Sequence, residues 1–259
     1  MSPAPCTPDE LSAFLRQAAA DAGGAGIERM AVSGATAWCN TSSCSTEQAK
    51  ALALAAQRPP PGFVVYKFGS RAVVGAFRLP VGEEVVLKYY YPRGLHKQLS
   101  YGLKGTRCRQ SWLAALALQR AGIPTPPALM IAEWRGLGGL WWQRSVLATG
   151  KARGITLQDW VETCGADLAR LDAMAVRLRT IAGRMDEFRI GHGDLKATNI
   201  LVADDDSVAL VDLDAVSILN NNAAWPAVRE RDQRIFAGNW KGMPRAAQAF
   251  ANVFKIHDR

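Results

Sequence analysis

One short segment of the sequence contains polar residues whose side chains could act together in catalysis. The run Gly-His-Gly-Asp-Leu-Lys-Ala-Thr-Asn-Ile-Leu-Val contains His192, Asp194, Lys196 and Asn199 in the pattern H-x-D-x-K-x-x-N. Asp212 lies thirteen residues after Asn199, within Val-Asp-Leu-Asp. Phosphoryl transfer requires strict positioning and charge neutralisation but few covalent partners. The pattern, followed directly by an apolar strand, predicts that chemistry.

Each residue of the pattern has an expected role. Asp194 is placed to accept the proton of an attacking hydroxyl, and Lys196 can neutralise the moving phosphoryl group. Asn199 and Asp212 offer the oxygen ligands that Mg²⁺, a hard cation, requires. We expect His192 to orient the loop by hydrogen bonding. The alternative is a hairpin with polar surface residues, which the spacing and the second acidic motif disfavour.

A second group of residues indicates a nucleotide site. Lys88 ends the apolar run Val-Val-Leu-Lys, where kinase-type folds place the lysine that contacts the α- and β-phosphates. Gly69 and Ser70 lie between two predicted strands and could offer backbone N–H groups to phosphate, or form an ordinary turn, since G-x-G-x-x-G is absent. The expected cofactors are ATP and Mg²⁺.

The elements that position these residues change in type along the chain. Hydrophobic patterning and turn residues predict strands over residues 63–68, 71–79, 84–91, 128–132 and 140–147. They predict helices over residues 107–121, 156–162 and 166–188, a β-rich insertion at 200–202 and 208–211, and irregular structure after Val216. We therefore expect an α+β, two-lobed protein-kinase-like fold with a β-rich N-lobe and a mainly helical C-lobe.

The expected domain boundaries follow from these elements. Residues 1–61 form an N-terminal helical appendage, with one helix from Pro8, a second from Ser45, and a stiff end at three consecutive prolines. The N-lobe covers residues 62–147 and the C-lobe residues 148–259. The appendage contains no residues that suggest chemistry.

Charge is distributed unevenly along the sequence. The net charge is +8, and no acidic residue occurs between Glu84 and Glu133. Seven basic residues fall in that interval: Lys88, Arg93, Lys97, Lys104, Arg107, Arg109 and Arg120. Such a segment attracts phosphates of a nucleotide, a nucleic acid or an anionic lipid, although it could also be a solvated face.

The cysteines and the hydropathy indicate a cytoplasmic protein. The five cysteines are scattered, with no second Cys/His pair at ligand spacing beside Cys39 and Cys44, so a zinc site is disfavoured and a reducing compartment is expected. No apolar stretch approaches the roughly 20 residues of a membrane span. The N-terminus lacks the basic and apolar regions of a signal peptide.

Several segments resemble the bacterial lipopolysaccharide core kinases of the Kdo/heptose (WaaP-like) type. The resemblance covers about residues 63–240. It rests on Lys-Tyr-Tyr-Tyr from Lys88, on residues 104–112 and 122–126, on Val-Asp-Leu-Asp, where most kinases carry Gly at the last position, and on Arg231-Asp232, which is similar to the start of the helix after the motif.

The resemblance implies transfer of the ATP γ-phosphate to a sugar hydroxyl, on Kdo or heptose, of the lipopolysaccharide inner core. Lys88 would contact ATP, Asp194 would be the base, and Asn199 and Asp212 would bind the metal. The implied partners are the lipopolysaccharide core or a lipid A precursor and an anionic membrane surface, with no nucleic acid. The protein would be cytoplasmic, peripheral at the inner membrane. Aromatic residues 89–91 and 141–142 could lie at that interface or in the core.

Two departures from the family pattern leave alternatives open. The helix after Lys88 usually carries a Glu, but here the nearest positions are Gln110 and Ser111, and the connector 146–150 lacks an acidic residue. A pseudokinase that binds nucleotide or an assembly partner therefore remains open, as does a kinase acting on protein or another small molecule. Residues 215–259 contain three acidic and seven basic residues, which argues against a cationic antibiotic acceptor. No Ala-Pro-Glu follows Asp212, which argues against a protein kinase.

Overall fold

The computed structural model divides the chain into two compact units. It describes residues 6–20, 26–92, 94, 106–136, 141–164, 167–219 and 223–254. The sheet unit comprises residues 13–116 and 126–151, and the helical unit comprises residues 1–12, 117–125 and 152–259. These bounds differ from the expected ones mainly at the N-terminus, where most of the first 61 residues belong to the sheet unit.

The sheet unit is built on seven antiparallel strands in the order β1-β2-β6-β7-β5-β4-β3. The strands are β1 (Ile27–Val32), β2 (Ala35–Asn40), β3 (Val64–Phe68), β4 (Ala72–Arg78), β5 (Glu84–Tyr90), β6 (Ala128–Gly136) and β7 (Trp141–Gly150). The five strands expected from the sequence are confirmed. Strands β1 and β2 were not expected.

The β1–β2 hairpin joins the N-terminal segment to the sheet. Its tight turn consists of Ser33 and Gly34, both with positive φ (35° and 79°). Two positive φ values suit the twist of a two-residue hairpin. β2 then pairs with β6 from Ala35↔Trp134 to Cys39↔Met130. A Ser-Gly pair between two apolar runs was the signal for this hairpin in the sequence.

Helix α2 (Thr46–Gln57) covers the core of the sheet unit. It begins with a capping box in which the Ser45 and Gln48 side chains satisfy each other's backbone N–H groups. Its buried residue Leu52 belongs to the same hydrophobic cluster as Leu87 and Tyr89 of β5. The Tyr89 hydroxyl donates to the Ala55 carbonyl oxygen at 2.7 Å. The apolar face of α2 therefore packs against the middle of the sheet.

The aromatic residues expected either at an interface or in the core mostly lie in the core. Tyr89, Tyr90 and Trp142 are 1%, 4% and 3% exposed, whereas Tyr91 is 38% exposed. Tyr89 and Tyr90 are consecutive on β5 and point to opposite faces of the sheet, and both are buried. They contribute core packing rather than a continuous aromatic surface.

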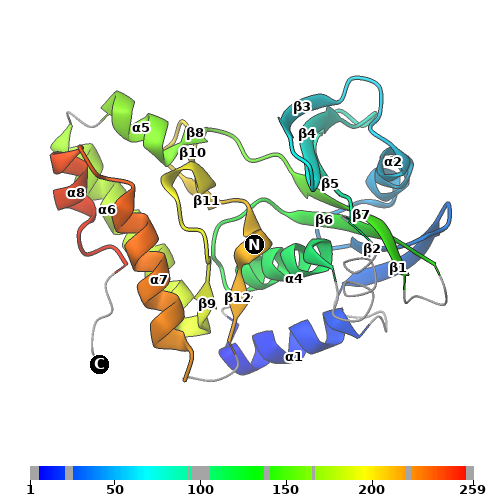
Figure 1. Cartoon of the computed structure of the whole chain (residues 1–259), viewed down its shortest axis with the longest axis horizontal. Coiled ribbons are helices and arrows are strands. Elements are labelled where there is room, and N and C mark those ends of the chain that lie inside the picture. Colours follow the sequence, from blue (N-terminus) through cyan, green and yellow to red (C-terminus); the bar gives the residue numbers. More distant parts are fainter. Residues whose placement is uncertain are drawn as a thin grey trace. The chain divides into compact units, whose positions relative to one another are not determined.

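The helical unit contains α5 (Leu157–Cys164), α6 (Leu168–Phe188), α7 (Trp225–Gly238) and α8 (Pro244–Phe250). Figure 1 shows α8 beside the long helix α6. An ion pair between Arg229 and Asp186 joins α7 to the last turn of α6. Short strands accompany them: β8 (Ile155–Thr156), β9 (Ile190–Gly191), β10 (Ile200–Val202), β11 (Val208–Leu210) and β12 (Ser217–Ile218). The expectation of irregular structure after Val216 is wrong for α7 and α8. Pro226 and Pro244, each in the first turn of its helix, were the signals for them.

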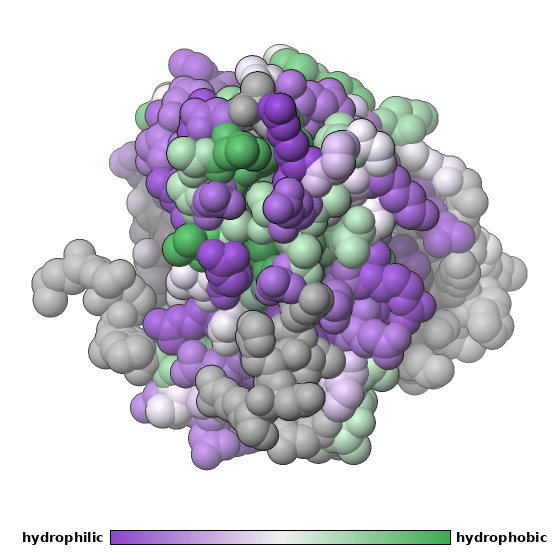
Figure 2. Space-filling model, turned by 90° about the vertical axis from the view of Figure 1, so that its left-hand side faces the viewer, coloured by the Kyte–Doolittle hydropathy of each residue, from purple (hydrophilic) through white to green (hydrophobic). Residues whose placement is uncertain are grey.

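Aromatic side chains form the core between α7 and α8. The Phe236 ring lies 5.4 Å from that of Trp240 and 4.7 Å from that of Phe254, between ring centroids. On the face drawn in Figure 2 hydrophilic residues predominate, and hydrophobic residues form small groups among them. Among the described residues, every helix is too short or too polar to cross a lipid bilayer.

Candidate active site

The β10–β11 hairpin brings two distant polar residues together. Ile200 of β10 pairs with Leu210 of β11, so Asn199 and Val211 are the next residues at the open end of the hairpin. The Val211 N–H donates to the Asn199 carbonyl oxygen at 2.9 Å, which extends the ladder by one bond. Asp212 follows directly. A separation of thirteen residues in the sequence thus becomes proximity at one hairpin end.

Asp194 lies at the centre of a small polar network. The Lys196 Nζ is 2.8 Å from Asp194 Oδ1, and the Asn199 amide donates to the Asp194 carbonyl oxygen at 2.8 Å and to Oδ2 at 3.2 Å. Because the amide nitrogen of Asn199 faces Asp194, its amide oxygen is left for another partner. Partial burial alone would raise the pKa of Asp194, but the bonds from Lys196 and Asn199 outweigh it and lower that pKa. Asp194 is therefore ionised at neutral pH and can accept a proton.

His192 connects the loop of Asp194 to the residue before Asp212. It is 1% exposed, and its Nε2 lies 3.1 Å from the Val211 carbonyl oxygen. Burial lowers the pKa of His192, so the ring is neutral at pH 7. A neutral ring must carry its proton on Nε2 in order to donate to a carbonyl. This bond gives His192 the orienting geometry expected from the sequence.

The side chain of Asp232, on α7, binds the backbone of the same loop. Its carboxylate accepts the N–H of His192 at 2.6 Å and that of Gly193 at 2.7 Å. It is 0% exposed, and burial raises its pKa, which the two N–H bonds offset only in part. The sequence placed Arg231-Asp232 at a helix start, but Asp232 lies in the second half of α7. Its contact with the loop spans about forty residues and leaves no local pattern.

The backbone conformation at position 193, and the lack of space beside it, require glycine. Its φ is +76°, and a Cβ there would lie 2.3 Å from the Ala215 carbonyl oxygen. Any side chain would push the loop away from the segment after Asp212. The small residue between His192 and Asp194 therefore permits the close approach of the two halves of the site.

Asn199 and Asp212 fit a magnesium site. Asp212 is exposed and has φ 57° and ψ 62°, a left-handed conformation that non-glycine residues adopt rarely and often at functional sites. Mg²⁺ in phosphotransferases is held by one or two protein oxygens together with substrate phosphates. No cluster of three or more His, Cys, Asp or Glu suited to a metal occurs in the described part of the chain. One amide oxygen and one carboxylate match the magnesium pattern.

The residues expected to bind nucleotide belong to the sheet unit, whereas Asp194, Lys196, Asn199 and Asp212 belong to the helical unit. Lys88 is half-buried in β5, and its Nζ lies 5.3 Å from the centroid of the Tyr90 ring. The Gly69 N–H donates to the Ala72 carbonyl oxygen at 3.0 Å, which closes the β3–β4 turn, and Ser70 is exposed in that turn.

A second lysine shares the face of Lys88. Val74 of β4 pairs with Lys88 on one side and with Lys67 of β3 on the other. Directly paired residues of antiparallel strands point to the same face of a sheet. Lys67 is exposed and was not singled out in the sequence. The pairing of β3, β4 and β5 places Lys67 on the same face of the sheet as Lys88.

The buried acid of the sheet unit lies on a strand rather than on the helix after Lys88. Helix α4 (Arg107–Arg120) contains no acidic residue, as the sequence showed at Gln110 and Ser111. Glu133 of β6 has a fully buried side chain, 0% exposed. Its carboxylate accepts from Thr106 at 2.5 Å and from Arg135 at 2.7 Å.

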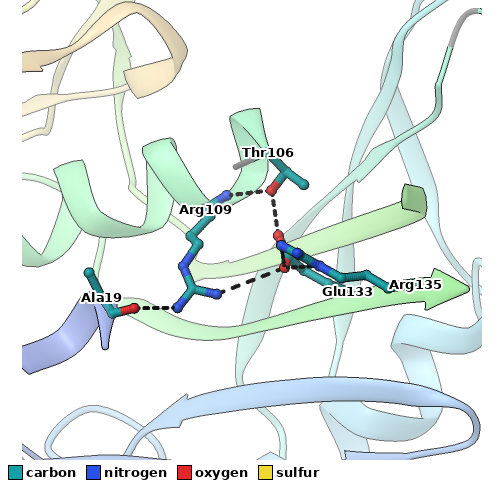
Figure 3. Close-up of polar contacts among 5 residues, drawn as sticks. All are labelled: Ala19, Thr106, Arg109, Glu133 and Arg135. Atoms are coloured by element: carbon teal, nitrogen blue, oxygen red, sulfur yellow. Dashed lines mark hydrogen bonds and ion pairs between the residues drawn. The ribbon is translucent and has the colours of Figure 1, made fainter. Parts of the chain in front are cut away.

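The Glu133 carboxylate anchors the N-terminus of α4. Figure 3 shows Thr106, Arg109 and Arg135 converging on it. The Thr106 hydroxyl also accepts the Arg109 N–H at 3.0 Å, in the manner of an N-cap, and Arg109 donates to the Ala19 carbonyl oxygen at 2.9 Å. Ser145 pairs with Tyr90 on one side and with Glu133 on the other, so these side chains point to one face of the sheet. Lys88, two residues before Tyr90 on β5, points to the same face. No sequence motif signalled this network.

The basic segment 88–120 is described only in part. Arg93, Lys97 and Lys104 lie outside the described residues. Arg109 is bound to the Ala19 carbonyl and lies 4.7 Å from the Trp38 ring, so it has a structural role within the sheet unit. At this position the structure favours an internal contact over a solvated basic face.

Comparison with known proteins gives a family and a fold. Residues 72–226 match the model of the "Lipopolysaccharide kinase (Kdo/WaaP) family". A solved structure of WaaP in complex with acyl carrier protein is 18% identical, covers 74% of this chain and 77% of its own, and has a TM-score of 0.53. A Stt7 homolog from Micromonas algae soaked with ATP is also 18% identical, covers 62% of this chain and 53% of its own, and has a TM-score of 0.44. No curated protein matches the sequence.

These findings confirm two expectations from the sequence. The likeness to WaaP confirms the α+β, protein-kinase-like fold. The family match spans well over half of the chain and includes Lys88, Asp194, Asn199 and Asp212. The chain is a kinase and belongs to the lipopolysaccharide kinase (Kdo/WaaP) family.

Proposed function

We propose that this kinase transfers the γ-phosphate of ATP, bound with Mg²⁺, to a Kdo or heptose hydroxyl of the lipopolysaccharide inner core. The observation that carries the proposal is the hydrogen-bonded connection of Asp194, Asn199 and Val211, the residue before Asp212, at one hairpin end. The match of residues 72–226 to the lipopolysaccharide kinase family supports the acceptor class.

The residues of the helical unit would carry the transfer. The acceptor oxygen forms a bond to the γ-phosphorus while the bond from that phosphorus to the bridging oxygen of ADP breaks, and the hydroxyl proton goes to the Asp194 carboxylate. Lys196, beside Asp194, neutralises charge on the moving group. Asn199 and Asp212 would hold Mg²⁺, which when bound offsets the negative charge of the phosphates.

The residues of the sheet unit would bind the nucleotide. Lys88 contacts the phosphates, and Lys67, on the same face two strands away, supplies a second positive charge. Gly69 and Ser70, in the β3–β4 turn, would approach the phosphates. The Gly69 N–H donates to the Ala72 carbonyl oxygen, which closes this turn.

The acceptor also suggests where the protein works. Lipopolysaccharide core and lipid A precursors are anionic and lie at a membrane surface, and the net charge of +8 favours association with such a surface. We place the enzyme at the cytoplasmic face of the inner membrane as a peripheral protein. Binding to anionic vesicles that weakens as salt rises would support this, and binding indifferent to salt would contradict it.

Transfer of ³²P from γ-labelled ATP to purified lipopolysaccharide tests the function. Two acceptors without core phosphate, one ending at Kdo and one extended by heptose, identify the sugar. We expect Mg²⁺-dependent labelling that falls about 10²- to 10⁴-fold in Asp194→Asn, which removes the base. Asp205→Asn is the matched control, because Asp205 is exposed in the β10–β11 turn. Equal labelling by wild type and Asp194→Asn would exclude Asp194 as the base.

A further inference from the structure

Arg229 is an arginine with almost no access to solvent. It is 1% exposed and lies one turn before Asp232 on α7. Its Nε is 2.5 Å from Asp186 Oδ1, and its Nη2 donates to Asp186 Oδ2 at 3.1 Å. Its guanidinium carbon lies 5.1 Å from the centroid of the Phe254 ring. A buried cation is stable only when it is paired, so Asp186 sets where Arg229 can lie.

Asp186 marks the start of the loop that carries the base. It lies in the last turn of α6, and its carbonyl oxygen accepts the N–H of Arg189, the left-handed residue that ends the helix. The chain then runs through β9 directly to His192. The ion pair uses both carboxylate oxygens of Asp186. It therefore fixes α7 to the point where the loop leaves α6.

Helix α7 also packs directly on the loop backbone between these points. A Cβ on Gly191 would lie 2.1 Å from a methyl group of Val228, the residue before Arg229. Four residues further into the helix, Asp232 accepts the N–H groups of His192 and Gly193. One helix thus holds the segment from Asp186 to Gly193 at its beginning, its middle and its end.

We propose that Arg229 is a positioning residue for the catalytic loop: its ion pair with Asp186 sets α7 so that Asp232 holds the backbone of His192 and Gly193 and, through them, Asp194. The inference rests on the proposed function only where it assigns a catalytic consequence.

The charge of Arg229 supports the same arrangement. An ionised carboxylate has two oxygens for two N–H groups, and Asp232 uses both. The charged or titratable groups near Asp232 are Arg229 on its own helix and His192 on the loop. Arg229 is a cation and favours the ionised form of Asp232, whereas the His192 ring is neutral at pH 7. Loss of Arg229 would raise the pKa of Asp232 further, so the acidic limb of the activity profile would move to higher pH.

Amide hydrogen exchange of the full chain tests the inference without any acceptor. The variants are Arg229→Met, Asp186→Asn and the conservative Arg229→Lys. The matched control is Arg234→Met, on the same helix, whose ion pair with Glu230 is 72% and 67% exposed. We expect the amides of His192 and Gly193 to exchange about tenfold faster in Arg229→Met and Asp186→Asn, with partial recovery in Arg229→Lys.

Kinetics supply the second readout. We expect kcat to fall on the order of 10- to 100-fold in Arg229→Met with the KM for ATP nearly unchanged, because a small misplacement of the base affects transfer and not nucleotide binding. Asp186→Asn, an isosteric change at a 41% exposed side chain, keeps the test valid if Arg229→Met does not fold. Exchange rates in Asp186→Asn equal to those in Arg234→Met would overturn the inference, whether or not lipopolysaccharide is the acceptor. Absence of transfer by wild type would instead contradict the proposed function alone.

Discussion

The substitution Glu133→Gln tests how much the sheet unit depends on its buried carboxylate. Gln keeps the shape of the side chain but removes its charge and replaces one acceptor oxygen by a donor. The Glu133 side chain is 0% exposed, and those of Arg109 and Arg135 are 15% and 27% exposed. Both arginines would lose their shared counter-charge in a region that water reaches poorly.

The magnitude follows from that burial. Breaking a fully buried ion pair costs about 3–5 kcal/mol, because the remaining charge is left without compensation. Arg135 keeps some contact with water, and the Nη1 of Arg109 is 3.9 Å from the carboxylate, so the cost lies toward the lower end. We expect a loss of about 3 kcal/mol in the free energy of unfolding, which corresponds to a fall in Tm of roughly 6–12 °C.

Urea unfolding followed by tryptophan fluorescence measures this loss, since Trp134 is next to Glu133 on β6. The control is Glu84→Gln on β5 of the same sheet, where the Glu84 side chain is 41% exposed and pairs with Lys151 at 3.1 Å. Such an exposed pair contributes about 1 kcal/mol or less. If Glu133→Gln proved no more destabilising than Glu84→Gln, the idea that Glu133 anchors α4 would be refuted.

Three further predictions concern the site. Asn199→Ala removes an oxygen ligand, so the Mg²⁺ concentration for half-maximal transfer should rise several-fold and excess Mg²⁺ should restore part of the rate; an unchanged requirement would exclude Asn199 as a ligand. Lys67→Gln should raise the KM for ATP by about 3- to 10-fold, roughly 1 kcal/mol, whereas the exposed Arg58→Gln should not; equal KM values would remove Lys67 from the nucleotide site. Burial lowers the pKa of His192, so below its unfolded pKa of about 6.5 the unfolded chain binds the additional proton and stability falls as pH falls. His192→Gln should weaken this dependence, as urea titrations between pH 7 and 5 would show, and an unchanged slope would contradict it.

The candidate catalytic residues could be predicted from the sequence because they are close together along the chain. Asp194, Lys196 and Asn199 occupy one loop, and Asp212 follows at the far end of a short hairpin. Local backbone geometry brings such residues together in almost any context that forms the hairpin. The spacing therefore carried the information, and the structure supplied the contacts that join Asp194, Asn199 and Val211.

The β1–β2 hairpin and the C-terminal helices show where sequence patterns were weaker. Residues 27–40 form strands because they extend a sheet whose most distant member, β7, lies more than a hundred residues away, and β2 gains its partner β6 only in the folded chain. Helices α7 and α8 depend on burial of Phe236 and Phe250 against one another, and their local signals are a single proline each.

The sequence by itself determined the candidate site of this kinase: residue types suited to a base, a neutralising lysine and two oxygen ligands, at fixed spacing in a chain with an excess of positive charge. Only the tertiary structure decided which groups hold that chemistry in place. Asp232, Arg229 and Glu133 act across forty, forty-three and twenty-seven residues, respectively, on His192, Asp186 and Thr106. The physical reason is that a buried charge is stable only beside a partner, and packing of helices and strands, not distance along the chain, selects that partner.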